Sequence, residues 1–483
     1  MMDLRPCYEN YAGMAQETRL LFAMFSRFRL DRFAGLASGV RFTSRRRAGT
    51  TPFDRVLAQT EAVISQDTQR LAWPAALSHL PRPLRGMLFK LYLVLSEGRR
   101  VERLDLQLDS TDFGDFLWTT LFDKTLPPSD RALLQRALFY PTEMGHEYAR
   151  SLGMLPRLVQ RRILSEGWDV FFSANVTPYR FAPGTASMVR YYDALPLLSP
   201  HTIGGPWMHA GSHARLLSRN MADGSSFYCD SEPVRDDLLR LFPAAEARVH
   251  TIPVIVSDSL YPDPKPNREL RSILLRRRST VTSTGPVPLP ETIPLLFMAV
   301  STLEPRKNYT RLFRAFEIAR AMTVTPIQLL IVANPGWRSE TEVTELTALV
   351  QDGAFHLSGV PAEELRVLYS TVHCVVAPSR AEGFDYSGVE GMACGTPVIA
   401  SDIPVHRWVY GDAAAYFDPY SAEALAALMA RYAELPKDSG HLAETRQRGR
   451  AQARLYAPET LAPRWEAAIT AAALRPSPRS FTA

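Results

Sequence analysis

The sequence predicts an α/β protein with two doubly wound, Rossmann-like domains. From about residue 292, short apolar runs such as LLFMAVST and CVVAPS alternate with helical patterns, which is typical of parallel βαβ units. A less regular version of this alternation precedes residue 256. The segment between them is rich in proline and ends in turn residues, so we place the linker between the domains there.

The predicted C-terminal domain covers residues 292–455. Its strands are nearly continuous apolar runs, which indicates a parallel sheet buried on both faces. The expected strands are 295–302, 327–333, 355–360, 374–379 and 397–401. The expected helices are 309–322, 340–350, 361–370 and one that begins near Ser387.

The predicted N-terminal domain covers residues 1–255, with strands expected at 168–175, 186–196, 225–231 and 247–257. We interpret the region of about 28–165 as a large, partly helical insertion, in which DRALLQRALF and PRLVQRRILSEG are the clearest helices. Residues 256–291 form the predicted linker, including RSILLRRRST, and residues 456–483 form a last helix and tail.

Composition indicates an ordinary folded protein. Of the 483 residues, 46% are hydrophobic and 22% are charged, and four cysteines are scattered without metal-binding spacing, as expected for a reduced cytosolic protein. The first residues do not fit a signal peptide, and no apolar run is long enough to span a membrane. The net charge of +5 allows an anionic ligand, but without interleaved aromatic residues we do not expect nucleic-acid binding.

One basic segment has two interpretations. LPRPLRGMLFKLYLVLSEGRR, at 80–100, fits either an amphipathic helix lying on anionic lipid or a core helix with arginine at its ends. Peripheral association with the cytoplasmic face of the inner membrane therefore stays open.

Glu382 occupies a position where a ligand is expected. It lies between the predicted strand at 374–379 and the helix that begins near Ser387, at the carboxyl end of a parallel strand. Ligands of open α/β sheets bind outside those ends. Glu390, in the same stretch, matches a capping box with Ser387 as the N-cap. The surrounding glycines instead favour an anion site at the helix N-terminus, and they are Gly383, Gly388, Gly391 and Gly395.

A second candidate is STLEPRKNYT, at 301–310, which again joins a strand to a helix. Cations at a helix N-terminus oppose the helix dipole, so Arg306 and Lys307 do not favour the helix by themselves. A bound anion would reverse this effect. A solvated basic turn is the alternative interpretation.

Together these stretches resemble the retaining glycosyltransferases of family 4, which have the GT-B fold of two Rossmann-like domains facing a central cleft. The resemblance covers roughly residues 165–470, and it lies in the E-x7-E signature around EGFDYSGVEGMACGTPVIAS and in LEPRKN. It implies that the last helix crosses back to the N-terminal domain. It also implies a nucleotide diphosphate sugar, linked to GDP, dTDP or UDP, as donor.

The resemblance assigns roles to individual residues. Glu382 would bind the sugar hydroxyls, Glu390 the ribose hydroxyls, and Arg306 and Lys307 the diphosphate. The implied catalytic residues are Glu382, Arg306, Lys307 and Asp193. The full implied donor site is Arg306, Lys307, Glu382, Gly383, Phe384, Tyr386, Ser387, Gly388 and Glu390.

The implied acceptor side is Gly13, Tyr192 and Asp193. In MVRYYDALPLLSPHT, Tyr192 stands where the family usually has histidine, while Asp193 is kept. In YCDSEPVRDDLLRLFP, Ser231 is expected to open a helix. Near the donor, Asp385-Tyr386-Ser387 replaces the usual Gly-Leu-Pro, and Asp385 would repel a diphosphate unless it turns away or meets the sugar.

The expected function is retaining transfer of a hexose, with mannose or rhamnose favoured, to a glycan or lipid-linked acceptor of surface polysaccharide such as O-antigen or exopolysaccharide. No Asp-x-Asp occurs in the chain, so we expect neither a metal nor another cofactor. The alternative is a catalytically silent GT-B protein that serves as a binding or scaffold subunit of a polysaccharide-assembly complex.

Overall fold

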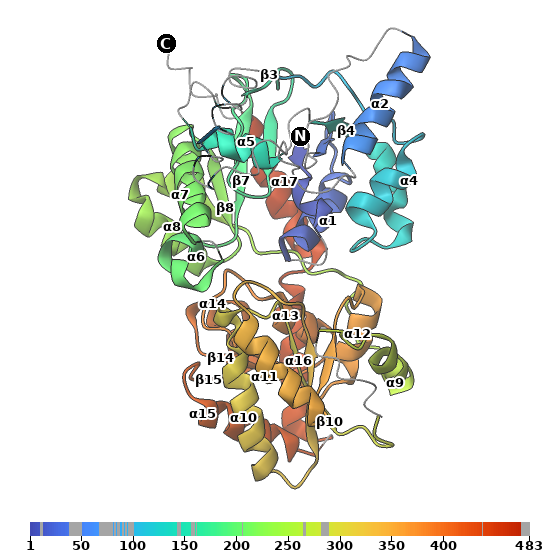
Figure 1. The fold of residues 1–483 in the computed structure, drawn as a ribbon, viewed down its shortest axis with the longest axis vertical. Coiled ribbons are helices and arrows are strands. Elements are labelled where there is room, and N and C mark those ends of the chain that lie inside the picture. Colours follow the sequence, from blue (N-terminus) through green and yellow to red (C-terminus); the bar gives the residue numbers. More distant parts are fainter. Residues whose placement is uncertain are drawn as a thin grey trace.

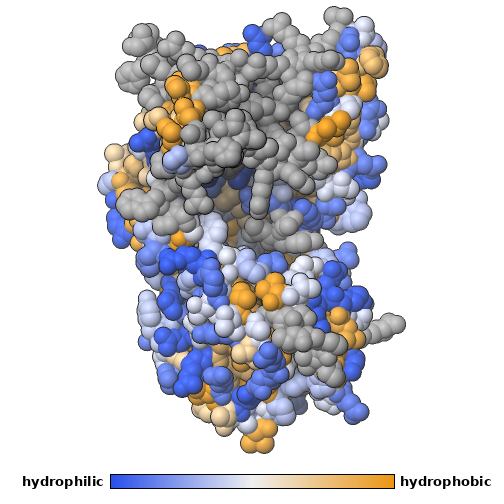
Figure 2. Space-filling model, viewed as in Figure 1, coloured by the Kyte–Doolittle hydropathy of each residue, from blue (hydrophilic) through white to orange (hydrophobic). Residues whose placement is uncertain are grey.

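The computed structural model describes residues 1–9, 13–37, 51–66, 101–142, 146–155, 160, 162–204, 206–263, 267–281, 289–436 and 438–474, with a few single positions from 81 to 94. They form two lobes, one above the other in Figure 1. The visible face of the lower lobe is mostly hydrophilic, and the surface is indented where the lobes meet (Figure 2).

The lower lobe is built on a six-stranded parallel sheet in the order β12-β11-β10-β13-β14-β15, counted over the described residues. Its strands are β10 (Leu295–Val300), β11 (Ile327–Val332), β12 (Phe355–Leu357), β13 (Cys374–Ala377), β14 (Val398–Ser401) and β15 (Ala414–Phe417). Its helices are α10 (Tyr309–Met322), α11 (Glu340–Gln351), α12 (Ala362–Thr371), α13 (Tyr386–Ala393), α14 (Pro404–Tyr410), α15 (Ala422–Ala433) and α16 (Gly440–Arg454).

Both faces of this sheet are buried, as the continuous apolar strands predict. Within β10, Phe297 belongs to one hydrophobic cluster and Met298 to another. Successive side chains of a strand point to opposite faces, so the two clusters lie on the two sides of the sheet. This confirms the predicted doubly wound fold.

The upper lobe holds a seven-stranded parallel sheet in the order β4-β2-β1-β6-β7-β8-β9, again within the described residues. Its strands are β1 (Met2–Asp3), β2 (Ala34–Ala37), β4 (Leu138–Pro141), β6 (Val170–Ser173), β7 (Ala186–Tyr191), β8 (Ser226–Cys229) and β9 (Val249–Thr251), and β3 (Val101–Glu102) pairs separately with β5 (Arg162–Ile163). Its helices are α1 (Gly13–Phe25), α2 (Pro52–Gln66), α4 (Gly114–Leu117), α5 (His146–Gly153), α6 (Leu195–Leu198), α7 (Pro206–Ala222) and α8 (Glu232–Leu241).

The region of about 28–165 differs from the predicted insertion, because β2 and β4 are strands of the main sheet. DRALLQRALF is also not one helix: a 3₁₀ helix covers Pro128–Arg136, and β4 follows. Of PRLVQRRILSEG, residues 156–159 and 161 lie outside the described residues, and Arg162–Ile163 is strand β5. The sequences of β2 and β4, AGLA and LFYP, contain no β-branched residue that would indicate a strand.

The segment at 256–291, predicted as a linker, contains the helix α9 (Asn267–Arg276). Its side chains Ile273 and Leu274 are buried with the core of the lower lobe. Arg277, just after the helix, pairs with Glu364 at 2.6 Å. The apolar face of α9 therefore overrides the proline-rich flanks that suggested an irregular connection.

The last helix, α17 (Pro458–Leu474), lies in the upper lobe (Figure 1). Trp465 is fully buried, with its ring centroid 5.7 Å from Phe25, 5.5 Å from Phe172 and 5.4 Å from Tyr228. The chain therefore returns to the N-terminal sheet after completing the C-terminal one.

In the described part of the chain, no helix combines the length and the apolar content needed to cross a bilayer. Most of the segment at 80–100, for which two interpretations stay open, lies outside the described residues.

Candidate active site

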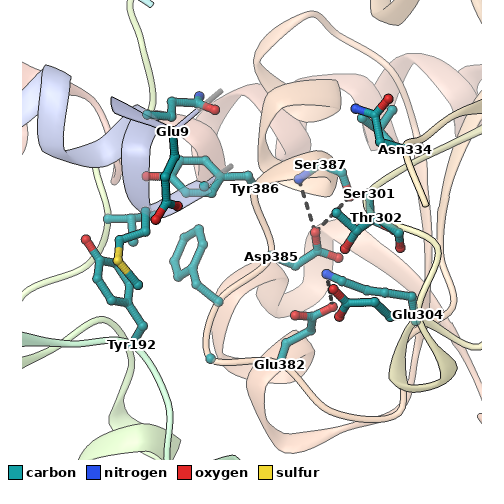
Figure 3. Close-up of a pocket in the computed structure, with 18 of the residues that line it drawn as sticks. Glu9, Tyr192, Ser301, Thr302, Glu304, Asn334, Glu382, Asp385, Tyr386 and Ser387 are labelled. Carbon is teal, nitrogen blue, oxygen red and sulfur yellow. Dashed lines mark hydrogen bonds and ion pairs between the residues drawn. The ribbon is translucent and has the colours of Figure 1, made fainter. Parts of the chain in front are cut away.

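A cavity of about 710 Å³ lies between the two lobes, a size that suits a small-molecule ligand. Figure 3 shows Glu9 and Tyr192 on one side of it and Glu304, Glu382 and Asp385 on the other. The cavity wall includes all the predicted site residues except Gly388. Sequence positions more than 300 residues apart thus meet at one place.

The centre of the C-terminal wall is a buried ion-pair cluster around Glu382. Arg306 Nη1 donates to Glu382 Oε2 at 2.7 Å, and Lys307 Nζ donates to Oε1 at 2.5 Å. Arg306 Nε also donates to Glu304 Oε2 at 3.0 Å. Burial raises the pKa of Glu382, but Lys307 and Arg306 outweigh this effect and hold the pKa below its usual value. Both cations are therefore balanced by protein carboxylates.

The turn that carries the two cations is held by Asn308. This residue has a φ of 61°, a left-handed conformation that asparagine tolerates better than most residues. Its Nδ2 donates to the carbonyl oxygens of Pro378 at 3.0 Å and Pro419 at 2.9 Å, and Arg380 Nε donates to its Oδ1 at 2.9 Å. The turn after β10 is thereby tied to the loop after β13, which brings Arg306 and Lys307 to Glu382.

The predicted N-cap of α13 is wrong, because Asp385, not Ser387, caps this helix. Asp385 Oδ1 accepts from Ser387 N at 3.1 Å and from Ser387 Oγ at 2.8 Å, and Oδ2 lies 3.3 Å from His406 Nε2. Burial raises the pKa of Asp385, but His406, Lys307 and Ser387 together outweigh it and leave the pKa well below its usual range. Asp385 thus turns toward its own helix and His406.

Glu390 does not complete a capping box. Its carboxylate is buried and accepts hydrogen bonds from Gln16 Nε2 at 2.8 Å and from the Tyr369 hydroxyl at 2.9 Å. Burial raises the pKa of Glu390 to about 7, although both hydrogen bonds oppose this shift. Gln16 belongs to α1, so this contact joins the two lobes.

Two of the glycines serve close packing. A Cβ added at Gly383 would lie 1.7 Å from the carbonyl oxygen of Tyr192, across the domain boundary. A Cβ at Gly388 would lie 2.3 Å from the hydroxyl of Tyr410, and Gly388 is also the predicted site residue that does not line the cavity. Glycine at 388 therefore permits helix packing inside the lower lobe, and we find no contact between it and the cavity.

The predicted acceptor-side residues lie opposite. Asp193 Oδ1 accepts from Leu195 N at 3.0 Å, and burial raises the pKa of Asp193 while Arg306 opposes the shift. The ring of Tyr192 lies over the Arg190 guanidinium, 5.5 Å from it. Gly13 begins α1 beside the ring of Tyr386.

Phe384 faces inward, because it is almost fully buried and its ring lies 5.1 Å from that of Tyr456. Ser231 opens α8 as predicted, accepting from Val234 N at 3.4 Å, and its Oγ also donates to the Gly383 carbonyl at 2.7 Å.

Sequence reasoning missed several residues of the cavity wall, among them Gln16, Asp230, Glu304, Asn334 and Trp337. The sequence could have indicated Asp230, because it lies near the end of a predicted strand, as Asp193 does. Nothing in the sequence indicated that Gln16 belongs to the site, since it lies inside a helix and its partner is 374 positions away. Among the described residues, no group of three or more His, Cys, Asp or Glu side chains is placed to hold a metal ion.

The two facing parallel sheets with a cavity between them define a GT-B fold. In agreement, the chain is similar to sucrose-phosphate synthase from Thermosynechococcus elongatus, with a TM-score of 0.51 and 19% identity over 70% of this chain and 84% of that one. It is also similar to Anabaena HepE in complex with UDP-glucose, with a TM-score of 0.50 and 14% identity over 70% and 92% of the two chains.

The sequence comparisons each cover part of the chain. Residues 287–454 match the family model described as glycosyl transferases group 1. O-antigen chain mannosyltransferase B of Escherichia coli is 33% identical over 162 residues, 32% of this chain and 41% of that protein. MMP alpha-(1->4)-mannosyltransferase of Mycolicibacterium hassiacum is 26% identical over 215 residues, 44% of this chain and 46% of that protein. The chain thus spans less than half the length of these two relatives.

Proposed function

We propose that this protein is a glycosyltransferase that moves a hexose from a nucleotide diphosphate sugar to a glycan or lipid-linked acceptor of surface polysaccharide. The observation that carries the proposal is the pair Arg306 and Lys307, held at the interdomain cavity beside Glu382. They lie in the segment that matches the group 1 glycosyltransferases.

The donor diphosphate would bind at Arg306 and Lys307. Arg306 and Lys307 bind Glu382 in the structure. A bound diphosphate would share these two cations, and Glu382 would then accept hydrogen bonds from the sugar hydroxyls. The N-terminus of α13 adds backbone amides at the same place. Because Asp385 is engaged by Ser387 and His406, the repulsion expected between it and a diphosphate is reduced.

The transfer would break the bond between the sugar C1 and the diphosphate oxygen, and form a bond from C1 to the acceptor oxygen. Negative charge grows on the departing diphosphate, where two preorganised cations stabilise it without a metal ion. The acceptor proton would pass to the departing phosphate, with retention at C1. A histidine in place of Tyr192 is then not required.

Mannose is the favoured sugar, because both of these bacterial relatives are mannosyltransferases, with rhamnose as the other candidate. We further propose that the protein acts on the cytoplasmic side, where nucleotide sugars are available, and that it associates peripherally with the membrane that carries a lipid-linked acceptor.

The alternative, a catalytically silent GT-B protein that serves as a binding or scaffold subunit, has one observation in its favour. Gln16 and Glu382 already occupy the groups that would bind ribose and diphosphate. A scaffold protein could keep such contacts permanently.

A donor screen tests the proposal. GDP-mannose, dTDP-rhamnose and UDP-glucose would be tested for thermal stabilisation and for release of the nucleoside diphosphate, with and without EDTA. We expect one donor to stabilise the protein and to be turned over in EDTA, and NMR of the product would report the configuration at C1. Stabilisation without turnover would favour the silent alternative, and the absence of both would refute the proposal.

A further inference from the structure

Asp230 occupies the junction between a strand and a helix at the edge of the N-terminal sheet. Strand β8 ends at Cys229, and Ser231 caps α8, so Asp230 lies between them at the carboxyl end of a parallel strand. Its backbone N–H donates to the carbonyl oxygen of Tyr191 at 3.3 Å. The backbone position of Asp230 is therefore well defined, and its side chain lines the cavity.

The side chain of Asp230 is buried and incompletely paired. The residue is 2% exposed, and among the described residues its Oδ1 has no hydrogen-bond partner. The guanidinium of the neighbouring Arg190 is engaged elsewhere: it binds Glu17 Oε1 at 2.6 Å, Glu17 Oε2 at 3.0 Å and the Ile252 carbonyl at 2.6 Å. An unpaired buried carboxyl is costly, so most such groups in proteins have partners.

The other aspartates of the cavity differ from Asp230 in this respect. Asp193 accepts from Leu195 N, and Asp385 accepts from Ser387 N. Both hold a loop or a helix end in place. Asp230 does not need its carboxyl for that purpose, since Ser231 caps α8 and binds the Gly383 carbonyl.

The position of Asp230 indicates what kind of ligand could pair with it. A Cβ built on Gly383 would lie 3.1 Å from Asp230 Oδ2, so Asp230 lies beside the residue that follows Glu382. Glu382 is the proposed ligand of the donor sugar. A carboxyl group at this place, with one oxygen unpaired, suits a ligand that donates hydrogen bonds beside the donor sugar, as a sugar hydroxyl does.

We propose that Asp230 binds a hydroxyl group of the acceptor sugar, next to the donor sugar held by Glu382. The inference rests on the proposed function and deepens it, because it assigns the acceptor as a sugar and places it against β8. The hydroxyl donates its hydrogen bond to Asp230 Oδ1, the atom without a partner.

The test is direct binding, which does not require turnover. Methyl α-D-mannoside would be titrated by NMR into the wild type, Asp230→Ala, Asp230→Asn and Asp236→Ala, each with GDP present. Asp236 is the matched control, since it lies on α8 with its side chain 74% exposed. The thermal shift with GDP reports whether each variant is folded.

We expect the Kd of the methyl mannoside to rise about tenfold in Asp230→Ala, as is typical for the loss of one hydrogen bond. Asp230→Asn keeps an acceptor oxygen and should be intermediate, and Asp236→Ala should match the wild type. A Kd in a folded Asp230→Ala within twofold of the wild type, or no binding to the wild type at millimolar concentration, would overturn the inference. If the wild type binds the mannoside but cleaves no nucleotide sugar, the proposed function fails while the sugar site stands.

Discussion

Gln16 of the N-terminal domain donates a 2.8 Å hydrogen bond to Glu390 of the C-terminal domain. This bond and the one from Ser231 to the Gly383 carbonyl both connect the N-terminal to the C-terminal domain, and Gln16, Glu390 and Gly383 line the cavity. A donor that binds Glu390 must therefore compete with Gln16. The two domains are linked through the same groups that are expected to hold the ligand.

Glu390 should make stability depend on pH. Its pKa is raised from 4.5 to about 7 by burial, so between these values the folded state holds a proton that the unfolded state has lost. The free energy of unfolding should then fall as pH rises from 4.5 to 7, by about 3 kcal/mol at roughly 1.4 kcal/mol per pKa unit.

Denaturant unfolding of the wild type and Glu390→Gln at several pH values measures this effect. The wild type should lose stability relative to the variant over that interval, because glutamine cannot ionise. Parallel curves for the two proteins would show that Glu390 does not titrate as described.

Lys307→Ala and Glu382→Ala should each abolish transfer. Lys307 and Glu382 form part of one buried ion-pair cluster, and loss of a preorganised charge at a reacting centre typically costs 100-fold or more. The lysine variant should stay folded, since Arg306 still pairs with Glu382. Initial rates with the donor from the screen, beside circular dichroism, give the measurement. Glu363→Gln, at an exposed position on α12, is the control, and wild-type turnover in either variant would exclude the assigned roles.

Gly383→Ala should separate the domains. The new Cβ would lie 1.7 Å from the Tyr192 carbonyl oxygen, and because this neighbour is backbone it cannot move aside as a side chain can. Small-angle scattering should show a larger radius of gyration than for the wild type, and activity should fall. Gly440→Ala is the matched control, since its Cβ would meet no atom within 4 Å. An unchanged radius for Gly383→Ala would mean that the contact is not required for closure.

Trp465→Ala should destabilise the N-terminal domain although the residue lies near the C-terminus of the chain. Its ring is fully buried against Phe25, Phe172 and Tyr228, and loss of such a side chain costs about 3–5 kcal/mol. Unfolding followed by denaturant titration should report the loss. Leu474→Ala, at a position 79% exposed on the same helix, should have little effect. Equal midpoints for Trp465→Ala and the wild type would contradict this packing.

The local sequence pattern predicted the type and position of an element correctly where that element is long and strongly periodic. The helix predicted at 309–322 is α10 at the same residues, and the strands predicted from 295 and 327 are β10 and β11. It failed for β2 and β4, because AGLA and LFYP contain none of the β-branched residues that marked β13 and β14 as strands. It also chose the wrong cap for α13, since Asp385 and Ser387 are both good N-cap residues and only the extended backbone at Asp385 distinguishes them.

By itself, the sequence determined the two-sheet architecture and placed both glutamates of the proposed donor site after one strand, because buried parallel strands leave a regular pattern of apolar runs along the chain. Only the tertiary structure decided which groups form hydrogen bonds and ion pairs with those glutamates, and where an acceptor sugar is expected. Gln16 meets Glu390, and Asp230 meets Gly383, across more than 150 positions of sequence. Such pairings depend on how the two domains pack against each other. A local sequence pattern cannot predict that packing.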